Sequence, residues 1–424
     1  MTDVIRILEK TEGLKGYKIN EYKKTSYELF FVHKSLETVR STDTTTTDVT
    51  VYVEHDGRIG DSSFSVYKSM GEKEIEESVQ KAVARAALVS NEPYELVPGG
   101  TLEAAVPTNL DRYSPEEMGR MIADAVYAAD TVPGGSINAL EIFITRNTSR
   151  VVNSRGVDKT QTVHHVMIEA IPTFTDEKQS VELYEDYRFA EFDAEKITAE
   201  IADKMKEVAD RANAVKPGKG FTADVLLRPG EIDELLWSLA YDCNYSTVYT
   251  RANLHKEGDN LQEGDGDKLT VTLKGIIEGS VRSAFFDGDG SSLTDTVVIK
   301  DGVVCGSYGS SRFGQYLGVK EPSGNLGCLK AEPGTLTDEQ LISAPYLAVV
   351  SMSGIQIEPY SDYIGGEIRL AYMHEGGKTV PMTGISMSGK LSEVLATLRL
   401  HEKTCVYMAY EGPKSLLLKN MEIL

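Results

Sequence analysis

The stretch VLLRPGEIDELLWSLAYD, residues 225–242, is the segment that decides the fold of the second half of the chain. Its first three residues are a short apolar run typical of a strand, and Pro229-Gly230 then forms a turn that begins a helix. Four apolar residues follow at the spacing i, i+3, i+4 and i+7: Ile232, Leu235, Leu236 and Leu239. The stretch therefore predicts a strand followed by a helix with an apolar face for packing.

The composition is that of an ordinary globular protein. Its 424 residues suggest two or three domains, and 41% of them are hydrophobic and 26% charged. A net charge of −21 disfavours a surface that binds the phosphates of DNA or RNA, which would need clustered lysine and arginine. The four cysteines form no CxxC pair, and the sequence contains neither a signal-type apolar segment near its start nor an apolar run of about 18 residues. We therefore expect a protein of the reducing cytoplasm that neither spans a membrane nor binds nucleic acid directly.

The first half contains a weak internal repeat. The segment ELFFVHKSLETVRSTDTTTTDVTVYV from Glu28 aligns with EIFITRNTSRVVNSRGVDKTQTVHHV from Glu141, and both alternate apolar and polar residues as strands do. A helical pattern follows each segment, at residues 72–89 and 193–215. Two strand-meander and helix units in tandem predict an α+β domain, with a chance similarity of binary patterns as the alternative.

A change of composition after residue 216 predicts a domain boundary. Pro217, Gly218 and Gly220 interrupt the preceding helical pattern, and glycine-rich turns between short strand patterns follow. We therefore predict an N-terminal α+β domain at 1–216 and a β-rich C-terminal domain at 217–424. Within the latter, the sequence predicts short helices at 337–342 and 391–400.

Tight turns are predicted at several points. Asp301-Gly302 and Gly376-Gly377 each separate two strand-like runs, as in two-residue hairpins. Ser114, Pro115 and Glu117 form the pattern of a helix start with a capping box. The runs GSYGSSRFG and FDGDG are expected to be turns, the latter because it lacks the closing glutamate of a calcium-binding EF-hand loop.

Three further segments of the second half resemble a known family in their order and spacing. They are AFFDGDGSSLTDTVVIKDGVV from Ala284, SGNLGCLKAEPGTLTDEQLI from Ser323 and PYSDYIGGEIRLAYMHEGGKTVPMTGISMSGKLSEVL from Pro359. Together with residues 225–242 they resemble the TldD/TldE (PmbA) family, long labelled "modulator of DNA gyrase". The chain departs from the family pattern at the turn Ser361-Asp362-Tyr363 and at Lys390, where asparagine is usual.

The resemblance implies a contrast at the first helix of the C-terminal domain. TldD-type members have His-Glu-x-x-x-His there, two metal ligands with a glutamate that activates water, an arrangement that suits zinc. The matching positions in this chain are Trp237, Ser238 and Asp242. On a regular helix they lie within an arc of roughly 140°, but tryptophan is no ligand, serine is no general base at neutral pH, and one aspartate binds a metal weakly. We therefore expect no catalytic residue and no metal or other cofactor in this chain, with zinc in a TldD-type partner.

The candidate replacements for the missing metal ligands are histidines and cysteines elsewhere in the chain. TldD-type members also take a cysteine ligand from near the C-terminus, for which Cys405 is the nearest candidate, with His401 four residues before it. The run CVYMAY reads as a strand, which favours a buried cysteine instead. His164 and His165 are adjacent on an expected strand and so point to opposite faces.

The TldE-like pattern implies a non-catalytic subunit that pairs with a TldD-like metallopeptidase and acts on unfolded or modified peptides, as a homodimer or heterodimer. Extended peptides would dock by strand addition at a sheet edge. Two alternatives stay open at this point. The chain is a stand-alone homo-oligomeric binding or scaffold protein, or it is a metallopeptidase with non-standard ligands such as Asp242, His401 and Cys405.

Overall fold

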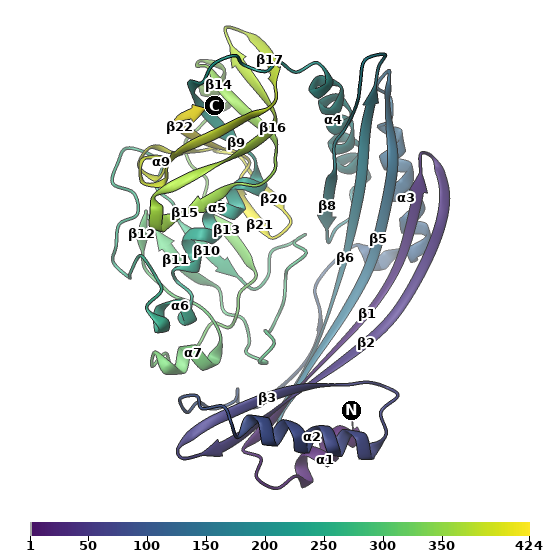
Figure 1. Ribbon diagram of the computed structural model, residues 1–424, viewed down its shortest axis with the longest axis vertical. Helices are drawn as coiled ribbons and strands as arrows, with labels where there is room; N and C mark the ends of the chain where they lie inside the picture. The colour runs from purple at the N-terminus through teal and green to yellow at the C-terminus, as the bar shows by residue number, and fades with distance from the viewer. Residues whose placement is uncertain (1) are drawn as a thin grey trace.

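The computed structural model describes residues 2–424 and has a long curved sheet alongside a β-rich unit (Figure 1). We call residues 2–212 the N-terminal unit and residues 221–424 the C-terminal unit. The architecture mixes helices and sheets throughout, which confirms the predicted α+β class. The predicted boundary at 216/217 falls in the connection between the units, and the division into two separately folding domains remains a prediction.

The N-terminal unit is one eight-stranded sheet with the strand order β3-β2-β1-β5-β6-β4, and with β7 and β8 also paired to β6. Four of its strands are 17 to 21 residues long, and their many threonine, valine and tyrosine residues favour extended backbone. The strands are β1 (Gly16–Val32), β2 (Ser35–His55), β3 (Arg58–Val66), β4 (Gly100–Ala105), β5 (Gly135–Asn153), β6 (Val157–Thr175), β7 (Ser180–Glu182) and β8 (Glu185–Phe189). The helices are α1 (Thr2–Lys10), α2 (Glu72–Ala86), α3 (Pro115–Ala128) and α4 (Ala194–Ala212), with the 3-10 helix η1 (Leu110–Arg112).

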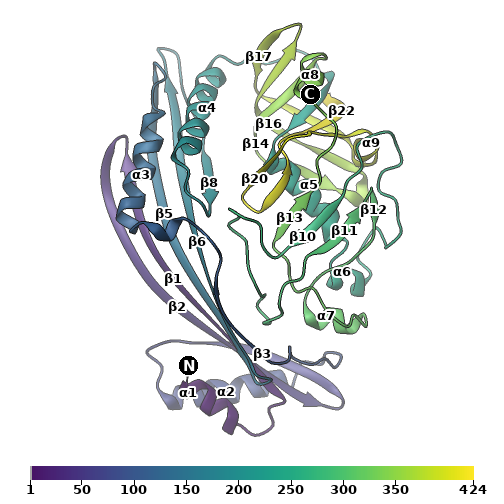
Figure 2. The ribbon, with the colours of Figure 1, turned by 180° about the vertical axis from the view of Figure 1, so that it is seen from behind.

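The four long helices pack on the same face of this sheet. Ile19 pairs with Val49 and Val152 across the strands, and these residues form a core with α1 and α2. Leu29, which points to the same side of β1 as Ile19, belongs to the core beneath α3 and α4. Figure 2 shows α1 and α2 at one end of the sheet and α3 and α4 beside β5 and β6. The other face of the sheet is therefore available to the C-terminal unit.

The internal repeat is present, but its predicted register is wrong. Each half of the N-terminal unit is a helix, a long hairpin, a further strand paired to it and a second helix. The hairpin turn at 33–34 corresponds to the turn at 154–156, whereas the sequence alignment placed His33 against Arg146 within β5. The alternating pattern of a strand repeats every two residues, so binary patterning cannot distinguish registers that differ by an even number.

The C-terminal unit consists of two sheets around a shared core. One sheet has the order β12-β11-β10-β13-β21-β20 and the other β14-β9-β22-β18-β16-β15, with β17 and β19 at its margins. The strands are β9 (Phe221–Leu227), β10 (Val271–Lys274), β11 (Thr296–Lys300), β12 (Val303–Val304), β13 (Cys328–Ala331), β14 (Tyr346–Met352), β15 (Gln356–Glu358), β16 (Tyr363–Glu375), β17 (Lys378–Met382), β18 (Ile385–Lys390), β19 (Arg399–Leu400), β20 (Thr404–Tyr407), β21 (Tyr410–Pro413) and β22 (Leu416–Ile423). The helices are α5 (Pro229–Tyr241), α6 (Tyr245–Thr250), α7 (Ser311–Tyr316), α8 (Asp338–Ile342), α9 (Leu391–Thr397) and the 3-10 helix η2 (Pro359–Ser361).

The strand and helix predicted for residues 225–242 are confirmed as β9 and α5. The four predicted apolar residues of α5 are buried in the core shared by the two sheets. The predicted capping box at Ser114 is present, and both predicted hairpin turns form, with Asp301 and Gly302 at positive φ. The helix expected at 391–400 forms but ends at Thr397. The prediction that the run GSYGSSRFG is only a turn is wrong, because α7 begins within it.

The two units meet in several places, one of which is where residues 285–292 lie against the free face of the long sheet; another is the Tyr372 hydroxyl, which donates to Asp210 of α4 at 2.7 Å. Phe286 packs against Val151 and Val157. Lys159 Nζ donates to the carbonyl oxygen of Gly290 at 2.7 Å. The Gln161 carboxamide donates to the carbonyl of Phe286 and accepts from the amide of Phe285, at 3.1 and 2.7 Å. The expected FDGDG turn is thus part of the contact between the units.

Candidate functional site

Trp237, at the first motif position, packs against another aromatic side chain. Trp237 lies half-buried on α5, and its ring meets that of Tyr308 with centroids 6.5 Å apart in an edge-to-face arrangement. Such aromatic contacts stabilise the core by about 0.5–1.5 kcal/mol beyond burial alone. The indole ring takes up the space beside α5 at this position, and it has no atom that could bind a metal ion.

A carboxyl group lies one helical turn before the indole. Asp233 Oδ1 and Trp237 Nε1 are both buried, and within residues 2–424 neither atom makes a hydrogen bond of regular geometry, although the indole N–H lies close enough to lower the pKa of Asp233 slightly. Burial raises the pKa of Asp233 to about 6, against the opposing effect of the nearby Arg282. This face of α5 therefore holds a carboxyl that is easier to protonate than usual.

The second motif position, Ser238, is used within the helix. Its hydroxyl donates to the carbonyl oxygen of Leu235 at 2.7 Å, a local bond that serine commonly makes. This hydroxyl therefore cannot replace the glutamate that acts as a general base on water.

The third position, Asp242, pairs with a histidine that sequence reasoning left without a role. Asp242 caps the end of α5, and its Oδ2 lies 2.9 Å from His255 Nδ1. The same carboxylate accepts from the backbone amides of Leu254 and His255 at 3.2 and 3.1 Å. The pair orients the imidazole, as a carboxylate does for a histidine that binds or moves a proton.

The Asp242–His255 pair lines a cavity of about 720 Å³. Cys243 and Ser307 also line it, but no hydrogen bond in the described chain joins either residue to His255. Burial raises the pKa of Cys243 to about 12, so its thiol stays protonated at neutral pH. The cavity has the size of a ligand site, and it holds an oriented imidazole without an activated nucleophile.

The candidate ligands His401 and Cys405 lie in separate environments. His401 is fully buried; its Nε2 lies 3.1 Å from Asp338 Oδ1, and its Nδ1 accepts from the Lys403 amide at 2.9 Å. Lys403, Lys414 and His401 together hold the pKa of Asp338 well below its usual range. Both ring nitrogens of His401 are therefore engaged.

Cys405 lies on β20, and the residues between it and His401 do not form a helix, as the sequence predicted. Burial raises the pKa of its thiol. Across residues 2–424, no three side chains of histidine, cysteine, aspartate or glutamate converge to hold a metal ion. The structure thus does not bring Asp242, His401 and Cys405 together, and the residues at the motif positions do not fit a zinc site of the TldD type.

The two adjacent histidines of β6 point to opposite faces, as expected. His164 lines a cavity of about 950 Å³ on the helix-covered face, together with Arg146, Thr162 and residues near the start of α3. Its Nδ1 is buried without a hydrogen-bond partner in the part of the chain described. On the opposite face, burial lowers the pKa of His165 to about 4.

Comparison with known proteins supports a family assignment. Residues 220–424 match the PmbA/TldA metallopeptidase C-terminal domain. No curated protein matches the sequence.

Solved structures resemble the fold over the whole chain. TldE from Thermococcus kodakarensis superposes with a TM-score of 0.80 at 16% identity, covering 100% of this chain and 99% of that one. A proposed modulator of DNA gyrase from Bacteroides thetaiotaomicron gives a TM-score of 0.81 at 15% identity, with 99% and 97% covered. A protein described in the same way from Thermotoga maritima gives 0.78 at 15% identity, with 100% and 99% covered.

These observations define the class of protein: a long sheet covered by helices on one face lies against a C-terminal domain of two sheets, and that domain is of the metallopeptidase type. The second half of the chain, residues 220–424, belongs to the PmbA/TldD metallopeptidase family, and the fold of the whole chain resembles that of TldE. In the residues described, no helix is long and apolar enough to cross a membrane.

Proposed function

We propose that this chain is a non-catalytic, TldE-like subunit of a TldD/TldE-type peptidase assembly. The observation that carries the proposal is the use made of the three motif positions. Trp237 packs on Tyr308, Ser238 bonds to its own helix, and Asp242 binds His255. The helix keeps its buried face while the positions that hold metal and activate water in TldD-type members serve other contacts. The likeness of the whole fold to a protein named TldE supports the same proposal.

In this proposal the chain supplies binding surface to a TldD-like metallopeptidase that holds the zinc. The partner would carry out hydrolysis, and this chain would contribute walls and sheet edges along which an extended peptide docks by main-chain hydrogen bonds. Unfolded or modified peptides are the substrates that fit such recognition, because their backbone is free to pair. We place the assembly in the cytoplasm, in line with the cysteine usage of the sequence.

Co-expression with the TldD-like chain of the same genome tests the proposal. We expect a stable hetero-complex by size-exclusion chromatography with light scattering, with zinc and peptidase activity that are lost when the partner's metal ligands are replaced. Replacing Trp237 with phenylalanine in this chain should leave zinc content and turnover per partner unchanged.

Two results would contradict the proposal. A homodimer that ignores the TldD-like chain would favour a stand-alone binding or scaffold protein. Peptidase activity of this chain alone, with one equivalent of metal that disappears in Asp242→Asn, would favour non-standard ligands.

A further inference from the structure

A third cavity, of about 360 Å³, lies between the two units and apart from α5. Its walls come from the face of β1, β2 and β3 that is free of helices, from residues 94–97, from residue 289 and from the start of α7. The volume falls within the range of small-molecule sites. None of the residues that line it lines the cavity at Asp242.

Two cations line this cavity, Lys18, which pairs with Asp289, and Arg312, which has no ion pair among residues 2–424. The Arg312 guanidinium lies 5.1 Å from the ring centre of Tyr94, 5.4 Å from that of Phe313 and 5.6 Å from that of Tyr316. Its Nε donates to the Tyr316 hydroxyl at 3.1 Å. Among residues 2–424 no carboxylate forms an ion pair with Arg312, and its two Nη groups make no hydrogen bond to protein. The rings hold the side chain in place and leave its planar fork of donors free, which is the geometry that binds a carboxylate in two-pronged fashion.

Asp61, Glu95 and Asp289 are the acidic residues of the same cavity, and Glu95 pairs with Arg155 at 3.0 Å. Asp289 is neutralised by Lys18, whose Nζ lies 2.5 Å away. Asp61 Oδ1 accepts from Asn91 Nδ2 at 2.8 Å, and no cation within the described chain pairs with this carboxylate. Among the residues described, the cavity therefore contains one cation and one anion outside any ion pair; Arg312 and Asp61 attract each other at longer range without forming a salt bridge.

We propose that this cavity binds a free amino acid or a short peptide as a zwitterion, with the carboxylate on Arg312 and the ammonium group on Asp61. A ligand with both charges would satisfy both side chains at once, whereas a simple anion or cation would leave one of them unpaired. The rings of Tyr52 and Tyr94, which meet edge to face at 6.2 Å, provide an apolar wall for the ligand's own side chain.

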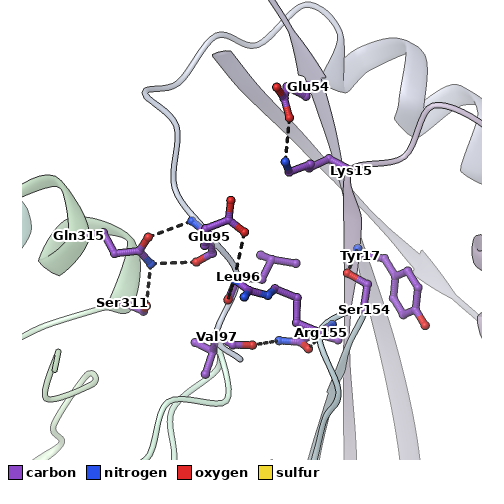
Figure 3. A network of polar contacts seen from close by, with 11 residues as sticks. Lys15, Tyr17, Glu54, Glu95, Leu96, Val97, Ser154, Arg155, Ser311 and Gln315 are labelled. Atoms are coloured by element: carbon purple, nitrogen blue, oxygen red, sulfur yellow. Dashed lines mark hydrogen bonds and ion pairs between the residues drawn. The ribbon is translucent and has the colours of Figure 1, made fainter. Parts of the chain in front are cut away.

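Glu95 and Leu96, which follow Tyr94 in the wall of the cavity, are held by hydrogen bonds from both units (Figure 3). The Gln315 carboxamide donates to the Glu95 carbonyl at 2.8 Å and accepts from the Glu95 amide at 2.9 Å. Arg155 Nη1 donates to the Glu95 carboxylate and to the Leu96 carbonyl at 3.0 and 3.1 Å. A wall fixed by two side chains, one from each unit, lowers the ordering cost of binding.

Isothermal titration calorimetry on the purified full-length chain tests the proposal. The probes are the twenty amino acids, dialanine and trialanine; binding of a free amino acid but no peptide identifies an amino-acid site, and the reverse identifies a peptide-end site. For the tightest probe, its C-terminal amide and its N-acetyl derivative should each bind at least about tenfold more weakly.

Two variants connect the loss to the proposed contacts. Arg312→Gln should weaken the tightest probe by about tenfold or more, and should bind the amide no worse than the unchanged protein does. Asp61→Asn keeps the oxygen that accepts from Asn91. It should also weaken the tightest probe by about tenfold or more, and it should bind the N-acetyl derivative no worse than the unchanged protein does. Arg120→Gln, on the exposed side of α3, is the matched control and should bind normally.

The proposal is overturned if no probe binds at millimolar concentration, or if both variants bind the tightest probe as the unchanged chain does. Circular dichroism of each variant separates lost binding from lost folding, and Asp61→Asn guards against a folding defect in Arg312→Gln. Because binding is measured on the isolated chain, this result and association with a TldD-like partner can fail independently.

Discussion

Asp233 is the residue whose ionisation should affect stability most clearly. Its pKa is raised by burial from 3.8 to about 6, so the folded protein prefers the protonated carboxyl. The stabilising contribution of that preference is complete below pH 3.8 and is lost as the pH rises through about 6. A shift of about two units corresponds to at most about 3 kcal/mol.

Asp233→Asn should therefore raise the free energy of unfolding at pH 7.5 by up to about 3 kcal/mol and change it little below pH 4. Urea unfolding followed by Trp237 fluorescence is the measurement, because this single tryptophan lies beside the substituted residue. Asp124→Asn, on the exposed face of α3, is the control. A difference between the two proteins that stays constant from pH 4 to pH 7.5 would refute the argument.

At the scale of single residues, sequence reasoning identified which positions had lost metal chemistry but not what replaced it. Trp237 and Ser238 could be excluded as ligand and base from their side-chain chemistry alone. The partner of Asp242 could not be found, because His255 reaches it from a loop beyond α6 and no periodic pattern connects the two. Arg312 was missed for a related reason, since its aromatic partners come from both units.

At the scale of elements, the packing of α2 on β3 depends on one glycine. A Cβ added at Gly60 would lie 1.9 Å from the carbonyl oxygen of Ala86 and 2.6 Å from that of Val89, at the end of α2. Backbone atoms cannot move aside as a flexible side chain can, so the helix end would have to shift.

Gly60→Ala should therefore cost about 1–3 kcal/mol of local stability. Hydrogen exchange measured by mass spectrometry should show faster exchange in β3 and α2 and unchanged exchange in the C-terminal unit. Gly218→Ala is the matched control, because nothing lies within 4 Å of its added Cβ and its φ is not positive. Equal exchange in the two variants would show that the helix end adapts without cost.

The elements themselves were predictable to different degrees. The capping box of α3, the apolar stripe of α5 and the two glycine hairpins are local signals, and all of them form as predicted. The alignment of the two repeated hairpins could not be predicted, because a threonine-rich alternating pattern looks the same after every shift of two residues. Only the position of the turns, at 33–34 and 154–156, fixes the register.

At the scale of the whole molecule, two glutamine side chains join the units in opposite directions. Gln161 of the N-terminal unit binds the backbone of residues 285 and 286, and Gln315 of the C-terminal unit binds the backbone of Glu95. Each carboxamide donates one hydrogen bond and accepts another, as a paired strand would. Gln161 is 8% exposed, so its removal leaves buried backbone groups without partners, which costs about 1–3 kcal/mol each.

Replacing both glutamines with leucine should therefore loosen the contact between the units while each unit stays folded. Small-angle scattering should show a larger radius of gyration than for the unchanged protein, and circular dichroism should be unaltered. Gln80→Leu, on the exposed side of α2, controls for loss of an amide as such. Because Gln315 also positions the wall of the cavity between the units, Gln315→Leu alone should weaken amino-acid or peptide binding there. A double variant as compact as the unchanged protein would show instead that the remaining contacts between the units, among them those of Phe286, Lys159 and Lys18, suffice to hold them together.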